Sequence, residues 1–148
     1  MSECRVLSLS AASSDGACGR RAVRRRAGQP SRVKATIEWA LDSTYLRIDD
    51  RSANSLFGNF LNFGMLGFDS PTGAFFLSMF NNFGDHPSYR GSFAGDTLVF
   101  HASIPSPRGT FEQEVRWMKE GENLRMQVYN DRGKGKQLTI DQVSTPAH

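Results

Sequence analysis

Several features that would place this chain in a well-known functional class are absent from its sequence. It contains no apolar run of about 20 residues, so it offers no candidate transmembrane helix. Its two cysteines are too few for a disulfide framework. It has no zinc-finger spacing, no P-loop and no glycine-rich dinucleotide fingerprint. After residue 32, no stretch of about 12 residues shows a strong helical period, which excludes the βαβ units of α/β folds.

The net charge of +3 combines two segments of opposite sign. Residues 1–34 have eight basic and two acidic side chains, which gives +6, whereas residues 35–148 have ten basic and thirteen acidic side chains, which gives −3. The basic residues of the first segment are Arg5, Arg20, Arg21, Arg24, Arg25, Arg26, Arg32 and Lys34. The high isoelectric point therefore belongs to this segment, and the mildly acidic remainder gives no indication of nucleic-acid binding.

Residues 1–32 form a tail that is rich in Arg and Ser and has few large apolar side chains. Such a composition cannot bury enough surface to offset the entropy of ordering, so we expect residues 1–30 to be disordered and the folded domain to span residues 33–148. Three roles stay open for the tail. It could be an organelle transit peptide, it could contact RNA, DNA or anionic lipid through its arginines, or it could be a misassigned start without function. We favour a tail without a function of its own.

The tail gives no indication of secretion. Serines interrupt the apolar stretch Val6–Ala12, which barely reaches the length of a signal-peptide core. Cys4 and Cys18 have no His or Asp partner nearby in the sequence, so we expect free thiols. We therefore expect a cytoplasmic protein.

The rest of the chain alternates short β-forming runs with turn residues. The predicted strands are Val33–Leu41, Thr44–Asp49, Phe60–Phe68, Ala74–Asn82, Ser88–Phe93, Thr97–Ile104 and three cleanly alternating runs within residues 111–118, 124–129 and 138–141. The polar stretch Arg51–Asn59 is predicted to be a loop. Asp69–Gly73 is predicted to be a tight turn, in which Pro71 fixes φ and the glycine supplies freedom at the exit.

These features predict an all-β fold, an antiparallel meander that forms a lipocalin-like β-barrel. About nine short strands in about 110 residues suit a sandwich or a barrel, and turns between sequence neighbours favour the barrel. Period-2 alternation with one polar face indicates a sheet that is wet on one side. A barrel of about eight strands can enclose one small ligand.

Three motifs indicate a family resemblance. They are Glu38-Trp39-x-Leu41 followed by Tyr45-Leu46, the run Gly64–Gly73, and Gly91-x-Phe93-x-Gly95-Asp96-Thr97-Leu98. In this order the chain resembles the bacterial lipocalin-like family known as domain of unknown function 1579, over about residues 33–143. The resemblance implies a calycin-type β-barrel with an internal cavity and no known reaction or catalytic residue. Family members usually begin with a short helix and a first strand that residues 1–32 do not match. Either the barrel lacks its opening strand, or the true start of the chain is lost; a missing strand would leave an open edge that invites dimerisation or aggregation.

The sequence shows no catalytic constellation. Serine catalysis needs a base and an oxyanion site, and no Gly-x-Ser-x-Gly motif occurs. His86, His101 and His148 form no local metal motif, although a spatial site of His86, His101 and a carboxylate stays open. Glu112 and Glu114 point to the same side of a strand, which we interpret as a solvated face rather than an acid–base pair. We predict no catalytic residue, no metal and no cofactor.

The aromatic content is high, because eleven phenylalanines exceed what one small core needs. Seven of them lie on or beside two neighbouring runs: Phe60, Phe63, Phe68, Phe75, Phe76, Phe80 and Phe83. They either fill the core and an outer contact with a partner, which we favour, or line an apolar ligand cavity. Because both faces of these runs are apolar, we expect the outside to be covered by another subunit or a loop.

Polar residues near the apolar runs are the candidate ligand contacts. Asn62 and Asn81 are expected to be buried amides that need partners, and to be cross-strand neighbours beside the cavity or partners of each other. The full set of candidate ligand-binding residues is Glu38, Asn62, Asn81, Tyr89, His101 and Arg116. Glu38 could instead face outward, since it alternates with Trp39.

Three functions follow as hypotheses. The first is non-enzymatic binding of a small apolar ligand inside the barrel. The second is a structural or dimerisation module without a ligand, in which the apolar outer face forms a homodimer. The third is an enzyme of unidentified reaction type, which would need two convergent titratable groups with perturbed acidity in a cavity. Nucleic-acid contact is expected only at the Arg-rich tail.

Overall fold

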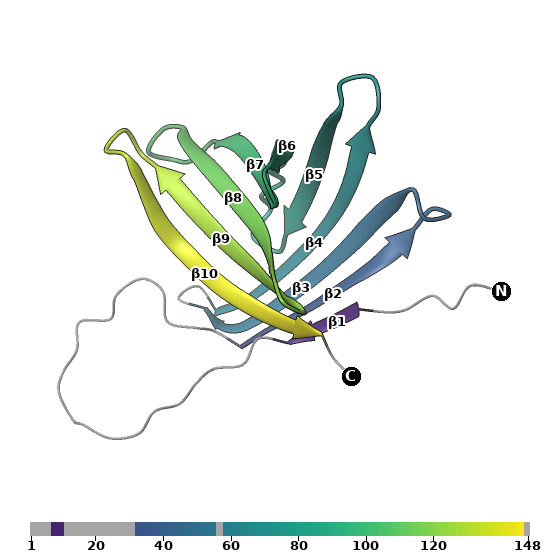
Figure 1. The fold of residues 1–148 in the computed structure, drawn as a ribbon. Helices are drawn as coiled ribbons and strands as arrows, with labels where there is room; N and C mark the ends of the chain where they lie inside the picture. Colours follow the sequence, from purple (N-terminus) through teal and green to yellow (C-terminus); the bar gives the residue numbers. More distant parts are fainter. Residues whose placement is uncertain (1–6, 11–31, 56–57, 147–148) are drawn as a thin grey trace.

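The structure is a computed structural model that describes residues 7–10, 32–55 and 58–146. All regular elements within these ranges are β-strands (Figure 1). They are β1 (Leu7–Ser10), β2 (Arg32–Ala40), β3 (Tyr45–Ser55), β4 (Gly58–Asp69), β5 (Ala74–Asn81), β6 (Ser88–Ala94), β7 (Thr97–Ile104), β8 (Phe111–Glu120), β9 (Asn123–Asp131) and β10 (Lys136–Pro146). The nine predicted strands correspond to β2–β10, so the all-β prediction is confirmed. Within the described ranges, no helix is long and apolar enough to cross a membrane.

Strands that are consecutive from β2 to β10 are also neighbours in the sheet, and each pair is antiparallel. The order β1-β10-β9-β8-β7-β6-β5-β4-β3-β2 returns to β1, which closes the barrel. Closure depends on β1, which pairs with β2 over four residue pairs and with β10 over two. In Figure 1, β1 lies between the end of β10 and the first half of β2, and the other strands curl round as one bent sheet. The predicted antiparallel meander barrel is therefore confirmed.

β1 corrects one expectation about the tail. The segment predicted to be disordered contains this strand, and β2 already begins at Arg32. Without β1, the edges of β2 and β10 would lack hydrogen-bond partners, which is the physical reason for a strand at this position. The tail therefore supplies the strand whose absence the family resemblance implies. The other predictions for the tail, including disorder, the arginine cluster within residues 20–26 and the free thiols of Cys4 and Cys18, lie outside the described residues.

β3 and β4 are longer than the sequence predicts. The stretch Arg51–Asn59, predicted to be a loop, is largely strand, because β3 extends to Ser55 and β4 begins at Gly58. Arg51 pairs with Leu61, and the register shifts only further along, between Ser52 and Ser55. Backbone pairing with an apolar neighbouring strand outweighs the weak β-propensity of Asp, Asn and Ser.

The turn between β4 and β5 has the predicted chemistry. The Gly73 N–H donates a 2.8 Å hydrogen bond to the Asp69 carbonyl, and the Thr72 hydroxyl donates one of 2.7 Å to the Asp69 carboxylate. Gly73 has a φ of 66°, in the left-handed region that favours glycine. This turn sets the register in which Asn62 lies opposite Asn81.

Alternation along the strands separates an inner core face from an outer face. The buried apolar core consists of Ile48, Leu66, Leu77, Tyr89, Leu98, Phe100, Ala102, Val115 and Val128. Residues two apart in a strand point to the same side. Asp50 therefore shares the core face with Ile48, whereas Phe63 and Phe80 point outward and are substantially exposed.

Phe100 is the fully buried centre of this core. Its register partner on β6 is Gly91, and a Cβ atom at Gly91 would lie 2.5 Å from Phe100 Cδ1. The ring of Trp117 stands edge-on to Phe100, with a centroid separation of 5.6 Å. The close approach of β6 to the phenyl ring therefore depends on the absence of a side chain at residue 91.

Candidate functional site

Three polar side chains cross β3, β4 and β5 in one row on the inner face. Asp50 is the register partner of Asn62, and Asn62 is the register partner of Asn81. The prediction that Asn62 and Asn81 are cross-strand neighbours is therefore confirmed. Directly opposed residues of an antiparallel pair have Cβ atoms about 5 Å apart. The three residues form one continuous polar strip, which we call the inner polar row.

Asp50 is the unusual member of the inner polar row. Its Oδ1 atom is buried and has no hydrogen-bond partner within residues 7–10, 32–55 and 58–146. Burial raises the pKa of its carboxyl group to about 6. Among the described residues, no Lys, Arg or His forms an ion pair with it. A buried carboxylate without such compensation costs free energy in the folded state.

The amides at the end of β5 have local partners. The Asn81 Oδ1 atom accepts hydrogen bonds from the backbone N–H groups of Phe83 and Asp85 at 3.0 and 3.1 Å. The Asn82 Oδ1 atom accepts the Leu61 N–H at 3.0 Å, and its Nδ2 atom donates to a β4 carbonyl at 2.9 Å. These contacts fasten the end of β5 to the following turn and to β4, and so hold the inner polar row in place.

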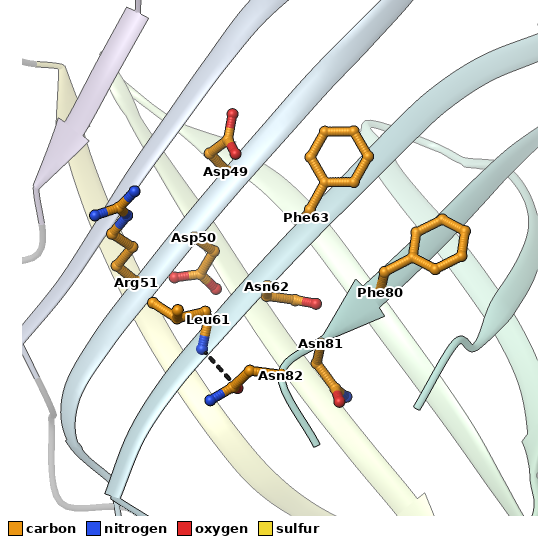
Figure 2. Close-up of a pocket in the computed structure, with 9 residues that line it drawn as sticks. All are labelled: Asp49, Asp50, Arg51, Leu61, Asn62, Phe63, Phe80, Asn81 and Asn82. Atoms are coloured by element: carbon orange, nitrogen blue, oxygen red, sulfur yellow. Dashed lines mark hydrogen bonds between the residues drawn. The ribbon is translucent and has the colours of Figure 1, made fainter. Parts of the chain in front are cut away.

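A pocket of about 260 Å³ lies across β3, β4 and the end of β5, and most of its lining residues point to the outer face (Figure 2). It is lined by Asp49, Asp50, Arg51, Leu61, Asn62, Phe63, Phe80, Asn81 and Asn82. Asp50, Asn62 and Asn81 are its inner-face members, whereas the rings of Phe63 and Phe80 extend away from them in Figure 2. The pocket is smaller than the roughly 300–1,000 Å³ of sites for drug-sized ligands, so it suits a small chemical group.

A second polar chain crosses the inner face on the opposite half of the sheet. The buried Tyr89 hydroxyl donates a 2.5 Å hydrogen bond to Gln113 Oε1, and Gln113 Nε2 donates to Asn130 Oδ1 at 2.8 Å. Burial raises the pKa of Tyr89 to about 12. This chain is internally satisfied and keeps Tyr89 protonated over the physiological range.

Three aromatic side chains on the inner face are exposed rather than packed. Trp39, Phe68 and Phe93 are 54%, 52% and 60% exposed, although residues two positions away on each strand belong to the core or pack against it. They lie next to the hairpin turns that follow β2, β4 and β6. We call these three residues the aromatic rim. The Phe75 ring joins two of them, with centroids 5.0 Å from Phe68 and 5.5 Å from Phe93.

The inner face also holds an unused hydrogen-bond donor. The Trp117 Nε1 atom is buried, and no residue in the described part of the chain accepts a hydrogen bond from it. Its neighbours on the adjacent strands are Leu98 and Met126, which offer no acceptor oxygen in their side chains. Buried Trp N–H groups usually have a partner, so this atom marks a place where an acceptor from outside the chain would be stabilised.

The outer face of β2 and β3 holds a charged group around Arg47. Its guanidinium forms a 2.8 Å ion pair with Asp49 and a 3.8 Å ion pair with Glu38. It also lies over the ring of Phe63, 5.4 Å from the centroid. Glu38 therefore faces outward, as its alternation with Trp39 allowed.

The outer face of β7, β8 and β10 holds a second charged group around Glu114. Its carboxylate accepts hydrogen bonds from Arg116 Nε at 2.6 Å and from Lys136 Nζ, and His101 Nδ1 lies 3.7 Å away. The Glu114 side chain is only 5% exposed, so the expectation of a solvated carboxylate at this position is wrong. Burial acts to raise the pKa of Glu114, but the bonds from Lys136 and Arg116 outweigh it and hold the pKa below its ordinary value.

The six predicted ligand-binding residues do not converge on one site. Asn62, Asn81 and Tyr89 lie on the inner face, where the two amides share the inner polar row. Glu38, His101 and Arg116 lie on the outer face, where the last two share Glu114 as a partner. Sequence alone could not separate these sets, because it does not show which side of each strand points to the barrel interior.

Sequence reasoning missed Asp50, Gln113 and Trp117 Nε1 as inner-face polar groups. Asp50 falls between the predicted strand Thr44–Asp49 and the predicted loop Arg51–Asn59, whereas it lies in the middle of β3. Its alternation with Ile48 was the available signal, since residues two apart share a face. Gln113 likewise alternates with Val115 on β8.

No metal centre is present among the described residues, since no group of three His, Cys, Asp or Glu side chains is placed to hold an ion. His86 lies in the turn after β5, and His101 contacts Glu114. The spatial site of His86, His101 and a carboxylate is therefore not formed in this part of the chain.

Comparison with known proteins adds no relative. No family model, no curated protein and no solved structure matches the chain. The resemblance to the lipocalin-like family stays a prediction.

Proposed function

We propose that this protein binds a small, mainly apolar ligand against the inner face of its barrel and catalyses no reaction. The observation that supports this most is the aromatic rim. Three large aromatic side chains point to the core side and are still about half exposed. Exposed apolar surface of this kind is unfavourable in water, and it is typical of ligand-binding and interaction surfaces.

The surroundings of the aromatic rim suit such a ligand. Apolar core residues continue from the rim along the inner face, with Leu66, Leu77 and Leu98 as the nearest buried side chains on β4, β5 and β7. The indole of Trp117 lies on the same face, edge-on to Phe100. A site with mostly apolar walls and a few placed polar groups is the usual composition of small-molecule pockets.

A binding assay with two matched variants tests this proposal. The probe is N-phenylnaphthylamine, a neutral apolar dye whose fluorescence rises on transfer from water. Phe68→Ser removes a ring of the aromatic rim, whereas Phe80→Ser removes a ring of equal exposure, 53% against 52%, from the outer face. We expect the full-length protein and the Phe80 variant to bind the dye and the Phe68 variant to bind it about tenfold more weakly, the loss of roughly 1.4 kcal/mol.

The proposal is wrong if the full-length protein does not bind the dye. It is also wrong if Phe80→Ser weakens binding as much as Phe68→Ser, because the dye would then occupy the outer face.

One observation favours a second function, a homodimer formed through the outer face. Leu61, Phe63 and Phe80 are exposed together on the outside of β4 and β5, and the Phe63 and Phe80 rings lie 6.4 Å apart. A second copy would cover these side chains. Sedimentation velocity should then give a dimer for the full-length protein and a monomer for Phe80→Ser, while Phe68→Ser stays dimeric. A monomeric full-length protein excludes this function.

Several expectations stay predictions. They are the lipocalin-like family, the absence of a catalysed reaction, the cytoplasmic location, and contact with nucleic acid through the arginine cluster within residues 20–26.

A further inference from the structure

The inner polar row and the aromatic rim share β4, where Asn62 lies towards the start of the strand and Phe68 lies next to its end. Asp50 lies in the middle of β3, and Asn81 is the last residue of β5. Phe68 lies beside the β4–β5 turn. The inner face is therefore apolar at one end and polar at the other, which suits a ligand with an apolar body and a polar head group.

The polar end offers acceptors and a negative charge. Asp50 contributes a carboxylate with one buried oxygen that no described residue bonds, and Asn62 contributes an amide beside it. In the described part of the chain no cationic side chain neutralises Asp50. A ligand that brings a positive charge and N–H donors would supply both missing partners.

We propose that the inner polar row binds the head group of the ligand, and that this head group is a protonated amine paired with Asp50. This inference rests on the proposed ligand-binding function and names the chemical class of the ligand. A neutral hydroxyl head group would satisfy the buried oxygen but leave the charge uncompensated. A carboxylate or phosphate head group would be repelled.

Among the titratable groups near the inner polar row, Asp50 sets the pH dependence of amine binding. Its register partner on β2 is Ala35, and its partner on β4 is Asn62, neither of which titrates. Asp85 lies in the turn after β5 and accepts a 3.4 Å hydrogen bond from Asn81 Nδ2. Asp49 and Arg51 alternate with Asp50 and point to the outer face. Because burial raises the pKa of Asp50 to about 6, its carboxylate is charged at pH about 7.5 and largely neutral at pH about 5.

The test compares two probes that differ only in the head group, phenethylamine and phenethyl alcohol. Their affinities are measured by displacement of N-phenylnaphthylamine from the full-length protein. At pH about 7.5 we expect the amine to bind at least about tenfold more tightly than the alcohol, the range of a charge-assisted hydrogen bond. The preference should disappear at pH about 5, where the Asp50 carboxylate gains a proton and the amine stays charged.

Asp50→Asn should abolish the preference at pH about 7.5, and Asp49→Asn is the matched control. Asp49 is the neighbouring aspartate on the outer face, so its variant should keep the preference. Equal affinities of the two probes for the full-length protein, or an unchanged preference in Asp50→Asn, would overturn the amine assignment while dye binding upheld the proposed function. A protein that binds neither the dye nor the probes would overturn both.

Discussion

Replacing Asp50 by asparagine should stabilise the ligand-free protein, and the size of the gain should depend on pH. Burial raises the folded-state pKa of Asp50 to about 6, from an ordinary value of 3.8 in the unfolded chain. Between these two values the folded state binds more protons than the unfolded state, so the free energy of unfolding falls as pH rises. Above pH about 6 the free energy of unfolding has fallen by the full amount. The amide side chain of the variant would carry no charge and suffer no such loss.

The magnitude follows from the shift. About two pKa units correspond to about 3 kcal/mol, since each unit is worth about 1.4 kcal/mol. Asp50 keeps some contact with water beside the pocket, which lowers the cost of its charge. We therefore expect Asp50→Asn to raise the free energy of unfolding by about 1–2 kcal/mol at pH about 7.5, and by close to zero below pH about 4.

Urea unfolding followed by tryptophan fluorescence at pH about 4, 5.5 and 7.5 measures this difference. The control is Asp49→Asn, which removes an exposed ion pair with Arg47 and should change stability by less than about 1 kcal/mol. A difference between wild type and Asp50→Asn that is the same at all three pH values would refute the reasoning. So would a variant less stable than the wild type at pH about 7.5, because it would mean that the ionised carboxylate has a stabilising partner.

Three further substitutions test the packing and the polar contacts. Gly91→Ala should lower the free energy of unfolding by about 1–3 kcal/mol, since its Cβ would lie 2.5 Å from Phe100. Glu114→Gln should lower it by about 1–3 kcal/mol near neutral pH, because two cations lose their shared carboxylate. The lowered pKa of Glu114 means that this stabilisation is present above the unfolded pKa and is lost as pH falls through the folded one. Tyr89→Phe should lower it by about 1–2 kcal/mol, because Gln113 Oε1 loses its donor. Each value comes from urea unfolding.

Matched controls lie on the same strands or in similar contacts. Ser92→Ala changes the exposed residue that follows Gly91. Glu112→Gln changes an exposed carboxylate on the same face as Glu114, and Tyr129→Phe removes an outer-face hydroxyl bonded to Gln127. All three should change stability by less than about 0.5–1 kcal/mol. A control substitution that lowers the free energy of unfolding as much as its test variant would contradict the explanation given for that pair.

Strand positions and turns could be predicted because they depend on local chemistry. Phe111, Gln113, Val115 and Trp117 alternate with charged or polar neighbours, and period 2 indicates a strand whatever its partners are. The turn Asp69–Gly73 combines a side-chain acceptor with a glycine in the left-handed region, which is also a local requirement. The neighbour relation of Asn62 and Asn81 followed from this turn, because a short hairpin fixes the register of its two strands.

The strand at residues 7–10 could not be predicted from its own composition. Leu7-Ser8-Leu9-Ser10 alternates as a strand does, but four residues inside an Arg- and Ser-rich tail are too few for this pattern to stand out. It forms a strand because β2 and β10, which are far apart in the sequence, present edges that need backbone partners. The same long-range pairing explains why the polar end of β3 is strand rather than loop.

Local sequence patterns were enough to predict a barrel of antiparallel neighbouring strands with more apolar side chains than one core needs. Alternation and turn chemistry are properties of a few consecutive residues, so they can be recognised without the fold. Three properties follow from the assembled barrel: one Asp50 oxygen is buried with no counter-ion among the described residues, Glu114 contacts three basic side chains, and the aromatic rim is half exposed. These properties depend on which strands meet around the barrel and how far they pair, because burial and charge neutralisation are set by neighbours that are distant in the sequence.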